Sequence, residues 1–425
     1  MQQFKKYDKY KDSGLQWLGD VPSGWAVKRL KDIGWMQNGV SNDASYFGSG
    51  FPFVSYGNVY NDSINFKSVN LLANSTIDEQ KTYSIKKNDI LFTRTSENIE
   101  EIGFASVVSE SIPKAVFSGF VIRVRQHKLI LDINFSKYFF RTDFHRNYFL
   151  NQMNIVTRVS LSQRVLVNLT TLVPPLQTQI KIAEFLDTQT ATIDTEIELL
   201  TTKATKYKQL KQSLINKVVT KGLNPSAAMK DTDIDWIGSI PKGWEVRRLK
   251  DLYKMNMGNT ILKDDLIEGG KIPVYSASAD DKYFGFVNSA NVILNKGDLV
   301  ICARGSIGHP KIVKELCTST QTTISCKRKN KHFYPNFVHY YTLGFSDSIF
   351  YYDKTAIPQF TVEDANYIPI ILPPQSEQVQ IVEYLDAKTG EIDRIITAIN
   401  DKISKLKQYR KVLINDVVTG KINVE

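Results

Sequence analysis

The feature that most constrains this chain is a duplicated frame. Trp17-Leu-Gly-Asp-Val-Pro-Ser-Gly-Trp25 returns as Trp236-Ile-Gly-Ser-Ile-Pro-Lys-Gly-Trp244, and each copy leads into a Val, two basic residues and Leu-Lys-Asp. A second motif closes each half, because the pattern of residues 174–194 returns at residues 373–393. The opening motifs lie farther apart than the closing motifs, so the halves share a frame and differ in the length that it encloses. Such a duplication predicts one architecture built twice, with contents free to diverge.

The composition indicates a globular protein with an anionic partner. The chain has 425 residues, of which 42% are hydrophobic and 11% aromatic, enough to fill the cores of two to four domains. Its formal charge is +10 and its pI about 9.1, with Lys and Arg spread along the whole length. A broad basic surface of this kind favours nucleic acid as partner, although many soluble proteins carry a similar charge.

Cysteine and histidine usage predicts no metal site. Cys302, Cys317 and Cys326 form no Cys-x-x-Cys pair, and the five histidines are dispersed. An odd number of cysteines suits a reducing compartment. The N-terminus has no apolar stretch of signal-peptide length, and no run of about 18 apolar residues exists that could span a membrane. We therefore expect a cytoplasmic protein.

A mixed α/β globule is expected inside each frame. Short apolar segments bounded by turn residues predict strands at residues 51–60, 89–94 and 117–124 in the first half, and 272–276, 298–304 and 321–326 in the second. Aromatic residues at helical spacing predict helices at residues 135–152 and 335–352.

A long amphipathic helix is predicted after each Pro-Pro. Apolar residues follow steps of three, four or seven at Ile193, Ile197, Leu200, Ala204, Tyr207, Leu214 and Val218, and again at Ile392, Ile396, Ile399, Ile403, Leu406, Leu413 and Val417. One narrow seam implies one helical partner, and the only partner of equal length is the other copy. We expect the two helices to pack antiparallel; the alternative is that each folds back on its own globule. Roughly 30 to 45 helical residues would form a rod about 45 to 65 Å long. Since one turn of duplex DNA is about 34 Å, this rod suits a reader of two separated half-sites.

With these motifs, the chain resembles the specificity subunits of type I restriction-modification systems over essentially its full length. The resemblance rests on the paired openings, on Pro-Pro followed by Gln and then Ile/Val-x-Ile-x-Glu-Phe/Tyr-Leu-Asp, and on the endings Leu214-Ile-Asn-Lys-Val-Val-Thr and Leu413-Ile-Asn-Asp-Val-Val-Thr. One departure is visible. The second frame has Ser376-Glu377-Gln378, close to the usual Glu-Gln of the family, whereas the first has Gln177-Thr178-Gln179 and lacks the acid, which leaves strict equivalence of the two helix starts open.

The resemblance implies a fold of two α/β (α+β) target-recognition domains in tandem, separated by two long helices that form an antiparallel coiled coil with pseudo-two-fold symmetry. Its predicted divisions are target-recognition domain 1 at 1–173, spacer helix region 1 at 174–222, target-recognition domain 2 at 223–372 and spacer helix region 2 at 373–425.

The resemblance also implies a non-catalytic subunit that chooses the DNA sequence. It would bind double-stranded DNA, reading one half of a split site with each domain, together with two adenine-N6 methyltransferase subunits and, in the full complex, restriction subunits. The chain itself would hold no cofactor, because S-adenosylmethionine, ATP and Mg would be bound by the partner subunits.

Candidate DNA-contacting residues are chosen by chemistry, because Arg and polar side chains in loops can bond base edges while basic residues can bond phosphates. The segments Thr93-Arg94-Thr95-Ser96 and Ala303-Arg304-Gly305-Ser306 follow matching strands, so they are expected at the same place in each globule. The full set of candidates is Tyr56, Asn58, Arg94, Ser96, Arg158, Ser162, Gln163, Arg164, Tyr275, Ser278, Lys282, Arg304, Ser306 and Gln359. Arginines could instead pair with a carboxylate, and tyrosines could pack in the core or at its rim.

Two groups are assigned structural roles. Trp17, Trp25, Trp236 and Trp244 could stack on bases, but duplicated Trp residues in a fixed frame fit packing that is the same in both halves. The helix lysines are interpreted mainly as a solvated face.

An enzyme is the main alternative. The chain has no glycine-rich phosphate loop, and Val173-Pro-Pro-Leu and Leu372-Pro-Pro-Gln lack the amide or carboxylate with which amino-methyltransferases hold an adenine. Glu79-Gln80-Lys81, downstream of Asp62, loosely matches a nuclease spacing but occurs in one half only. A third alternative is a protein scaffold, which steep salt dependence of DNA binding would exclude.

Overall fold

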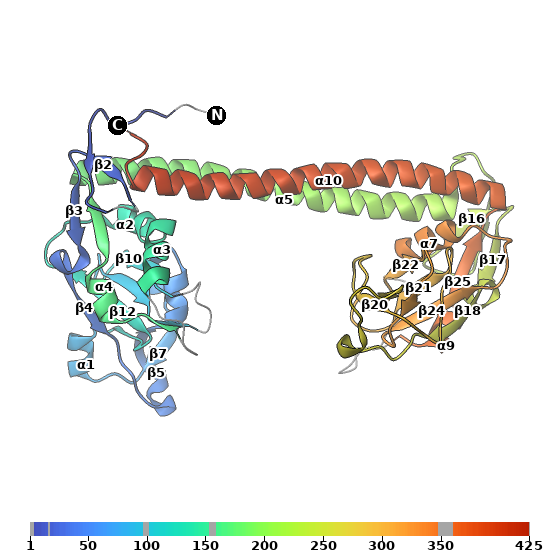
Figure 1. Ribbon diagram of the computed structural model, residues 1–425, viewed down its shortest axis with the longest axis horizontal. Helices are drawn as coiled ribbons and strands as arrows, with labels where there is room; N and C mark the ends of the chain where they lie inside the picture. Colours follow the sequence, from blue (N-terminus) through green and yellow to red (C-terminus); the bar gives the residue numbers. More distant parts are fainter. Residues whose placement is uncertain (1–3, 16–17, 97–101, 153–158, 347–359, 425) are drawn as a thin grey trace. The chain divides into compact units, whose positions relative to one another are not determined.

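The chain forms two compact units. The structure, a computed structural model, describes residues 4–15, 18–96, 102–152, 159–346 and 360–424. Unit 1 comprises Met1–Leu199 with Lys402–Glu425, and unit 2 comprises Leu200–Asp401. The boundaries fall inside the two long helices, α5 (Leu176–Lys221) and α10 (Gln375–Val418), so each helix contributes to both units. Each unit is an α/β globule joined to segments of both helices (Figure 1).

The main sheet of unit 1 has five strands. Their order is β4 (Gly34–Asn38), β12 (Val121–Gln126), β8 (Ile90–Thr93), β10 (Ala105–Val108) and β6 (Ser63–Ile64). All neighbours are antiparallel except β10 and β6. Ile90 and Phe92 belong to one core cluster while Leu91 belongs to another, as expected when successive side chains leave a strand on opposite faces.

Helices cover one face of this sheet and a small sheet lies on the other side. The first core cluster joins the sheet to α2 (Ile133–Phe139) and α3 (Asp143–Gln152). The second cluster joins it to strands of the small sheet, which has the order β11 (Val116–Phe117), β5 (Phe47–Val54) and β7 (Leu71–Ala73).

Unit 2 repeats this arrangement. Its main sheet has the order β18 (Tyr253–Met257), β24 (Thr323–Arg328), β21 (Leu299–Cys302) and β22 (Pro310–Ile312), and its small sheet the order β20 (Gly285–Val287), β19 (Ile272–Tyr275) and β23 (Thr318–Ser319). Helix α7 (Pro335–Gly344) takes the place of α2. The registers agree as well, since Thr93 pairs with Val121 and Cys302 with Thr323. The predicted duplication and α/β class are confirmed at the level of strand pairing.

Two-stranded ribbons carry the frame motifs. They are β1 (Tyr10–Asp12) with β2 (Asp20–Pro22), β3 (Ala26–Arg29) with β14 (Thr170–Val173), β15 (Met229–Asp231) with β16 (Ser239–Pro241), and β17 (Glu245–Arg248) with β25 (Pro369–Leu372). Shorter elements complete the units: η1 (Leu30–Asp32), η2 (Ala44–Tyr46), η3 (Tyr56–Tyr60), η4 (Phe66–Ser68), α1 (Ile77–Thr82), β9 (Thr95–Ser96), β13 (Val159–Ser160), α4 (Gln163–Val167), α6 (Leu249–Leu252), η6 (Lys263–Asp265) and α9 (Val362–Asn366).

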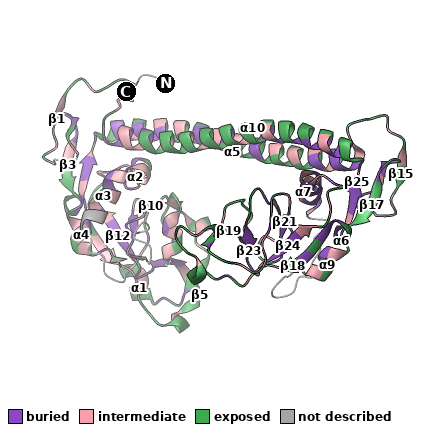
Figure 2. Ribbon diagram, turned by 45° about the vertical axis from the view of Figure 1, so that its right-hand side comes forward, coloured by how far each residue is buried: buried purple, intermediate pink, exposed green. Residues whose placement is uncertain are grey.

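The two long helices pack against each other in opposite directions. In unit 1, Asp194 and Glu196 of α5 form ion pairs with Arg410 and Lys402 of α10, so the α10 numbers fall as the α5 numbers rise. In unit 2, Lys211 bonds Asp393 at 2.7 Å. The predicted antiparallel pairing is therefore confirmed. Buried and exposed residues alternate along both helices (Figure 2).

The helix ends also pack on the globules. Ile182 and Leu186 of α5, with Leu413 and Val417 of α10, enter the core of unit 1. The start of each helix thus packs on the globule that precedes it in the chain, while its C-terminal end enters the core of the other unit. Neither helix folds back on its own globule, because each pairs antiparallel with the other. None of the helices in the described ranges is long and apolar enough to cross a membrane.

Two strand predictions were wrong in part. Residues 55–60 do not continue β5, because Ser55 and Asn58 form local hydrogen bonds that close the 3₁₀ turn η3 instead. Residues 117–124 do not form one strand, because a turn at Ser118–Phe120 separates β11 from β12, which belong to different sheets. The predicted helix at 135–152 is present as α2 and α3, whereas residues 347–352 of the other prediction lie outside the described residues.

Candidate nucleic-acid interface

A buried glutamine fixes the start of each long helix. Gln179 accepts a hydrogen bond from the Asp132 N–H at 2.7 Å and donates to the carbonyl of Pro174 at 2.8 Å. Gln378 accepts from the Tyr334 N–H at 2.7 Å and donates to the carbonyl of Pro373 at 2.7 Å. The helix start is therefore bonded to the loop before α2 or α7 in the same way in both units.

At the preceding position the units differ, since Glu377 accepts from the Trp244 indole N–H at 3.0 Å and Thr178 stands in its place in unit 1.

A tyrosine joins each helix to its globule about two turns further along. The Tyr138 hydroxyl donates to Asp187 at 2.6 Å and lies 3.2 Å from the Thr190 hydroxyl. Tyr340 repeats both distances with Asp386 and Thr389. Burial, together with the bond to the carboxylate, raises the pKa of both phenols, which keeps them protonated as donors. The Leu-Asp of the closing motif is thus a docking contact.

The tryptophans of the frame receive the helix ends. Trp25 and Trp244 are 2% and 1% exposed, which supports packing over base stacking; Trp17 lies outside the described residues and Trp236 is partly buried. A Cβ added at Gly420, where φ is +77°, would lie 2.4 Å from Pro22, and one at Gly222 would lie 3.1 Å from Trp244. These glycines allow the chain to turn close against the frame.

Each globule gathers several segments at one edge of its main sheet, which we call the turn edge. It comprises residues 38–41, 54–56, 93–96, 118–120 and 161–163 in unit 1, and residues 257–260, 275–277, 302–305, 320–322 and 360–361 in unit 2. In unit 1, the Arg94 N–H donates to Phe120 at 2.8 Å, and the Leu161 N–H donates to Arg94 at 2.7 Å. In unit 2, the same two bonds join Ala303 to Thr322 at 2.9 Å and Phe360 to Ala303 at 3.0 Å.

The structure brings several predicted residues of unit 1 to this edge. Arg94 donates from its guanidinium to the carbonyl of Gly119 at 3.2 Å, and the Gln163 amide donates to the side chain of Asn38 at 3.0 Å. Ser162 is exposed and caps α4 by accepting from the Val165 N–H at 3.3 Å.

The other predicted residues of unit 1 differ in location and in whether their polar groups form hydrogen bonds within the protein. Tyr56 and Asn58 lie in η3, where the Asn58 amide bonds Ser55 at 2.8 Å and the carbonyl of Ser68 at 2.7 Å. Ser96 lies in β9 and Arg164 is exposed on α4, while Arg158 lies outside the described residues.

The predicted residues of unit 2 are more scattered. Tyr275 is 2% exposed and belongs to a core cluster, so its side chain has the packing role that the sequence left open. Ser278 donates to Asp280 at 2.8 Å and accepts from the Lys311 ammonium at 3.1 Å. Lys282 and Arg304 are exposed and Ser306 is half-buried, whereas Gln359 lies outside the described residues.

The expected equivalence of Arg94 and Arg304 needs a correction of one residue. The strands β8 and β21 match at Asp89 and Asp298, each of which accepts an N–H bond from the residue three positions earlier at 2.8 Å. Counting from there, Arg94 corresponds to Ala303, as the shared turn-edge bonds also show. Arg304 is one residue further along the chain, so the two guanidinium groups leave their segments at different places.

Sequence reasoning missed the turn Ser118–Phe120 and its counterpart Thr320–Thr322. Both lie at the turn edge, and the Phe120 side chain is 62% exposed. The signal that could have found the first is the Ser-Gly pair inside a run that otherwise fits one strand, because such a pair indicates a turn or a close backbone approach.

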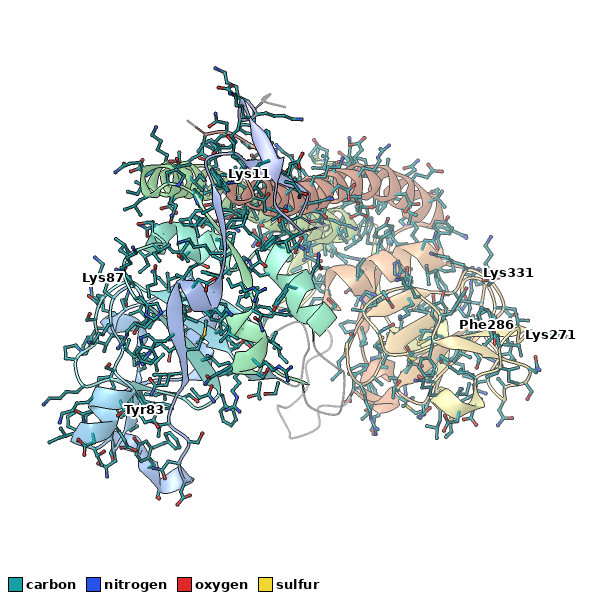
Figure 3. The ribbon with its side chains drawn as sticks, turned by 60° about the vertical axis from the view of Figure 1, so that its left-hand side comes forward. Lys11, Tyr83, Lys87, Lys271, Phe286 and Lys331 are labelled. Carbon is teal, nitrogen blue, oxygen red and sulfur yellow. The ribbon has the colours of Figure 1, made fainter. Side chains whose placement is uncertain are left out.

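Other basic residues have identifiable structural roles or simply face solvent. Arg125 forms a bidentate pair with Asp89, at 2.7 Å and 2.6 Å, so its charge is used inside the globule. Burial lowers the pKa of neighbouring Arg123 to about 10, and its guanidinium lies over the Trp35 ring at 4.7 Å. Lys87 and Lys331 point outward from their globules (Figure 3).

The residues with a nuclease-like spacing have structural partners. Asp62 forms an ion pair with Arg141. Glu79 accepts from the Thr76 N–H at 2.8 Å and from the Tyr46 hydroxyl at 3.0 Å, which caps α1 and lowers the Glu79 pKa. These bonds support the structural interpretation.

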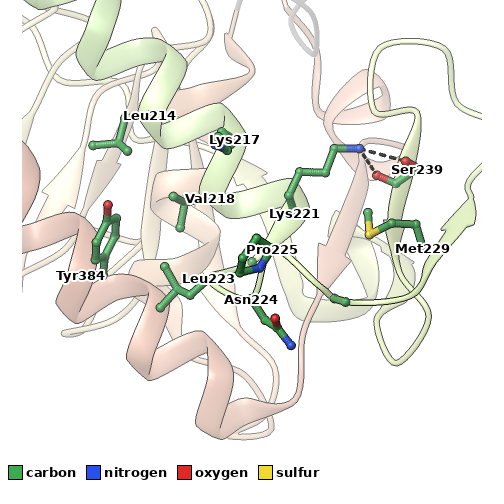
Figure 4. A pocket seen from close by; sticks show the side chains of 12 residues that line it. Leu214, Lys217, Val218, Lys221, Leu223, Asn224, Pro225, Met229, Ser239 and Tyr384 are labelled. Carbon is green, nitrogen blue, oxygen red and sulfur yellow. Dashed lines mark hydrogen bonds between the residues drawn. The ribbon is translucent and has the colours of Figure 1, made fainter.

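A hollow of about 690 Å³ lies at the end of α5 (Figure 4). Leu214, Val218 and Tyr384 form part of its apolar wall, and the Lys221 ammonium crosses to Ser239, bonding its hydroxyl at 3.0 Å. The lysine thus joins the helix end to the hairpin β15–β16.

The comparisons with known proteins agree with this organisation. The family model "Type I restriction modification DNA specificity domain" matches residues 22–203 and 241–405, once in each half. The chain belongs to the type I restriction-modification specificity subunits. Its matched regions include both turn edges and most of both long helices.

Relatives and solved structures match over nearly the whole length. The MjaX and MjaVIII specificity subunits of Methanocaldococcus jannaschii are 26% and 24% identical to this chain; both matches span 100% of it, and they cover 99% and 98% of the relatives. A chain solved in a study of complex assembly and conformational transition of the type I R-M system has a TM-score of 0.75 at 16% identity, covering 95% of this chain and 99% of that one. The HsdS subunit from Thermoanaerobacter tengcongensis has a TM-score of 0.54 at 17% identity, covering 95% and 98%. These likenesses support the fold, and the family is one of DNA specificity subunits.

Proposed function

We propose that this chain reads a bipartite site in double-stranded DNA, one half-site with each globule, and directs adenine-N6 methylation and restriction by partner subunits. The observation that carries the proposal is the turn edge, which is built twice with matching backbone bonds and different side chains. A repeated backbone with different exposed groups suits the reading of two different half-sites, because base edges are distinguished by the groups presented to them.

The chemistry would be divided among subunits. Two methyltransferase subunits and, in the full complex, restriction subunits would bind this chain and hold S-adenosylmethionine, ATP and Mg. The contribution of this chain would be non-catalytic: to bind the duplex and select its sequence. The net charge of +10 favours association with the phosphate backbone.

The two long helices would set the unread gap between the half-sites. Ion pairs join the two helices in both units, and apolar residues of both helices enter both cores. A paired rod of fixed length is suited to fixing a spacing, whereas a flexible linker would allow many spacings.

The decisive experiment is base-resolved adenine methylation of the source genome, compared between the intact strain and a strain deleted for this chain alone. We expect the deletion to abolish methylation at one split motif that has two short specific parts and a fixed gap. Re-expression of the chain should restore that motif. If the re-expressed chain and its methyltransferase partner methylate DNA without any split motif, the proposed function is wrong.

A further inference from the structure

The turn Ser118–Phe120 is held rigidly by its backbone. The Ser118 N–H donates to Val54 at 3.0 Å, the Val121 N–H donates to Ser118 at 2.9 Å, and the Gly119 N–H donates to Val40 at 2.6 Å. The Phe120 carbonyl in turn accepts from the Arg94 N–H. The turn therefore joins the end of β5 to the segments that follow β4 and β8.

Close packing at Gly119 explains why the turn is this tight. A Cβ added there would lie 2.0 Å from the Ser41 hydroxyl and 3.0 Å from the Val40 carbonyl. A side chain at the second residue of the turn would therefore require the Ser41 hydroxyl to rotate away and the Val40 carbonyl to shift. The side chain that the turn presents to solvent is Phe120.

Exposure alone does not assign a role to Phe120. Single exposed apolar side chains are common on protein surfaces, and Phe66 in the same unit is 57% exposed. Phe120 differs because its backbone is fixed on several sides and because it adjoins Arg94, whose guanidinium bonds the preceding residue, Gly119, at 3.2 Å. A large ring is thus presented to solvent with little freedom in its backbone.

The second globule has the same turn with different side chains. The Thr320 N–H donates to Tyr275 at 2.9 Å, the Thr323 N–H donates to Thr320 at 3.0 Å, and the Thr322 carbonyl accepts from Ala303. These bonds match those of Ser118, Val121 and Phe120. The sequence is Ser-Gly-Phe in unit 1 and Thr-Gln-Thr in unit 2.

We infer that this turn is a base-reading element in each globule and that Phe120 is a specificity-determining residue of the first. The inference rests on the proposed function. A phenyl ring offers no hydrogen bond, and the apolar group that a base pair presents in the major groove is the thymine methyl. Phe120 therefore selects a thymine-containing pair in one half-site. Thr322 occupies the corresponding place for the other half-site, with a hydroxyl that bonds Thr320 at 2.8 Å.

The test compares Phe120→Ala with the matched control Phe66→Ala in the full chain, co-expressed with its methyltransferase partner. Base-resolved methylation should show that Phe120→Ala relaxes one position of one half-site, with the gap and the other half-site unchanged. Phe66→Ala should leave the motif unchanged. Phe120→Leu should retain most of the preference, because it keeps an apolar group at the same place.

A second measurement tests the base itself. Replacing the selected thymine by deoxyuridine removes only its methyl group and should weaken binding of the unsubstituted complex about fourfold, since burying one such group is worth about 0.8 kcal/mol. The Phe120→Ala variant should bind the thymine-containing and the deoxyuridine-containing DNA with equal affinity. If deoxyuridine weakened binding by the variant as much as by the unsubstituted complex, the thymine contact would be wrong.

Different results would contradict the role of Phe120 and the proposed function of the chain. If the unsubstituted chain yields a split motif and Phe120→Ala yields the same motif at the same rate, the inference about the turn is wrong and the proposed function stands. Equal loss of both half-sites, with Phe120→Leu affected alike, would also overturn it, because it would show a general role in folding. Absence of any split motif with the unsubstituted chain would contradict the proposed function itself.

Discussion

At some matching positions the two units have the same residue, and at others they have different residues. Gln179 and Gln378 are kept, and in both units their amide bonds the same kinds of backbone group. Phe120 and Thr322 are changed, although their carbonyls accept matching bonds. Burial explains the difference. A buried side chain whose polar atoms form hydrogen bonds inside the protein cannot be replaced without losing those bonds, whereas a side chain that projects into solvent from a fixed backbone can vary.

Arg94 and Arg304 should each affect one half-site. We expect Arg94→Ala to relax or abolish recognition of one half-site and Arg304→Ala to do so for the other, because each arginine lies at the turn edge of a different globule. Base-resolved methylation measures both. Lys87→Ala, which removes an exposed charge at the other end of β8, is the control for charge alone. Equal damage to both half-sites would instead indicate misfolding or lost assembly.

Two glycines of α10 and its end should respond to alanine with opposite sign. Gly420→Ala should lower the free energy of unfolding by more than about 1 kcal/mol, because φ is +77° and the new Cβ would lie 2.4 Å from Pro22. Gly390→Ala should raise it by up to about 1 kcal/mol, because Gly390 lies inside α10 with nothing within 4 Å of the added atom. Urea unfolding of the full chain measures both. The same sign for the two variants would contradict this account.

At the scale of elements, apolar packing should stabilise the helix pair more than its ion pairs do. Ile193 is 5% exposed in the core of unit 1, whereas Leu199 on the same helix is 66% exposed. Ile193→Ala should cost about 2 to 4 kcal/mol and Leu199→Ala less than about 0.5 kcal/mol. Asp194→Asn, which breaks the partly exposed pair with Arg410, should cost no more than about 1 kcal/mol. A larger effect for Asp194→Asn than for Ile193→Ala would show that charge, not packing, holds the helices.

Elements with strong periodicity were predictable, and short polar ones were not. The spacing of apolar residues predicted α5 and α10 and their antiparallel pairing, because a single seam requires a single partner. The sequence predicted part of the turn edge, at Tyr56, Arg94, Ser96, Ser162, Gln163, Tyr275 and Arg304, and missed the turns at 118–120 and 320–322. Residues 55–60 and 118–120 look like strand from their aromatic and β-branched residues, but Asn58 and Gly119 close turns through local bonds and close approach. Base contact by the predicted residues stays a prediction.

At the scale of the whole molecule, the gap between half-sites should follow the helix length. One heptad inserted after Ile193, with a second after Arg410 to preserve the pairing, should keep both half-sites and lengthen the gap by about three base pairs, because seven residues add roughly 10 Å at 1.5 Å each. Base-resolved methylation reports the gap directly. Retention of the original gap would exclude the helices as the spacer.

The division into units has a consequence for the order in which the chain folds during synthesis. Unit 2 is one continuous stretch, Leu200–Asp401, while the core of unit 1 includes Leu413, Val417 and Val418 together with Trp25. The Tyr10 hydroxyl also bonds the Gly420 carbonyl at 3.0 Å. The half that a ribosome makes first is therefore the half that is completed last, and a translation stop shortly after Asp401 would strip the core of the first globule while leaving every residue of the second in place.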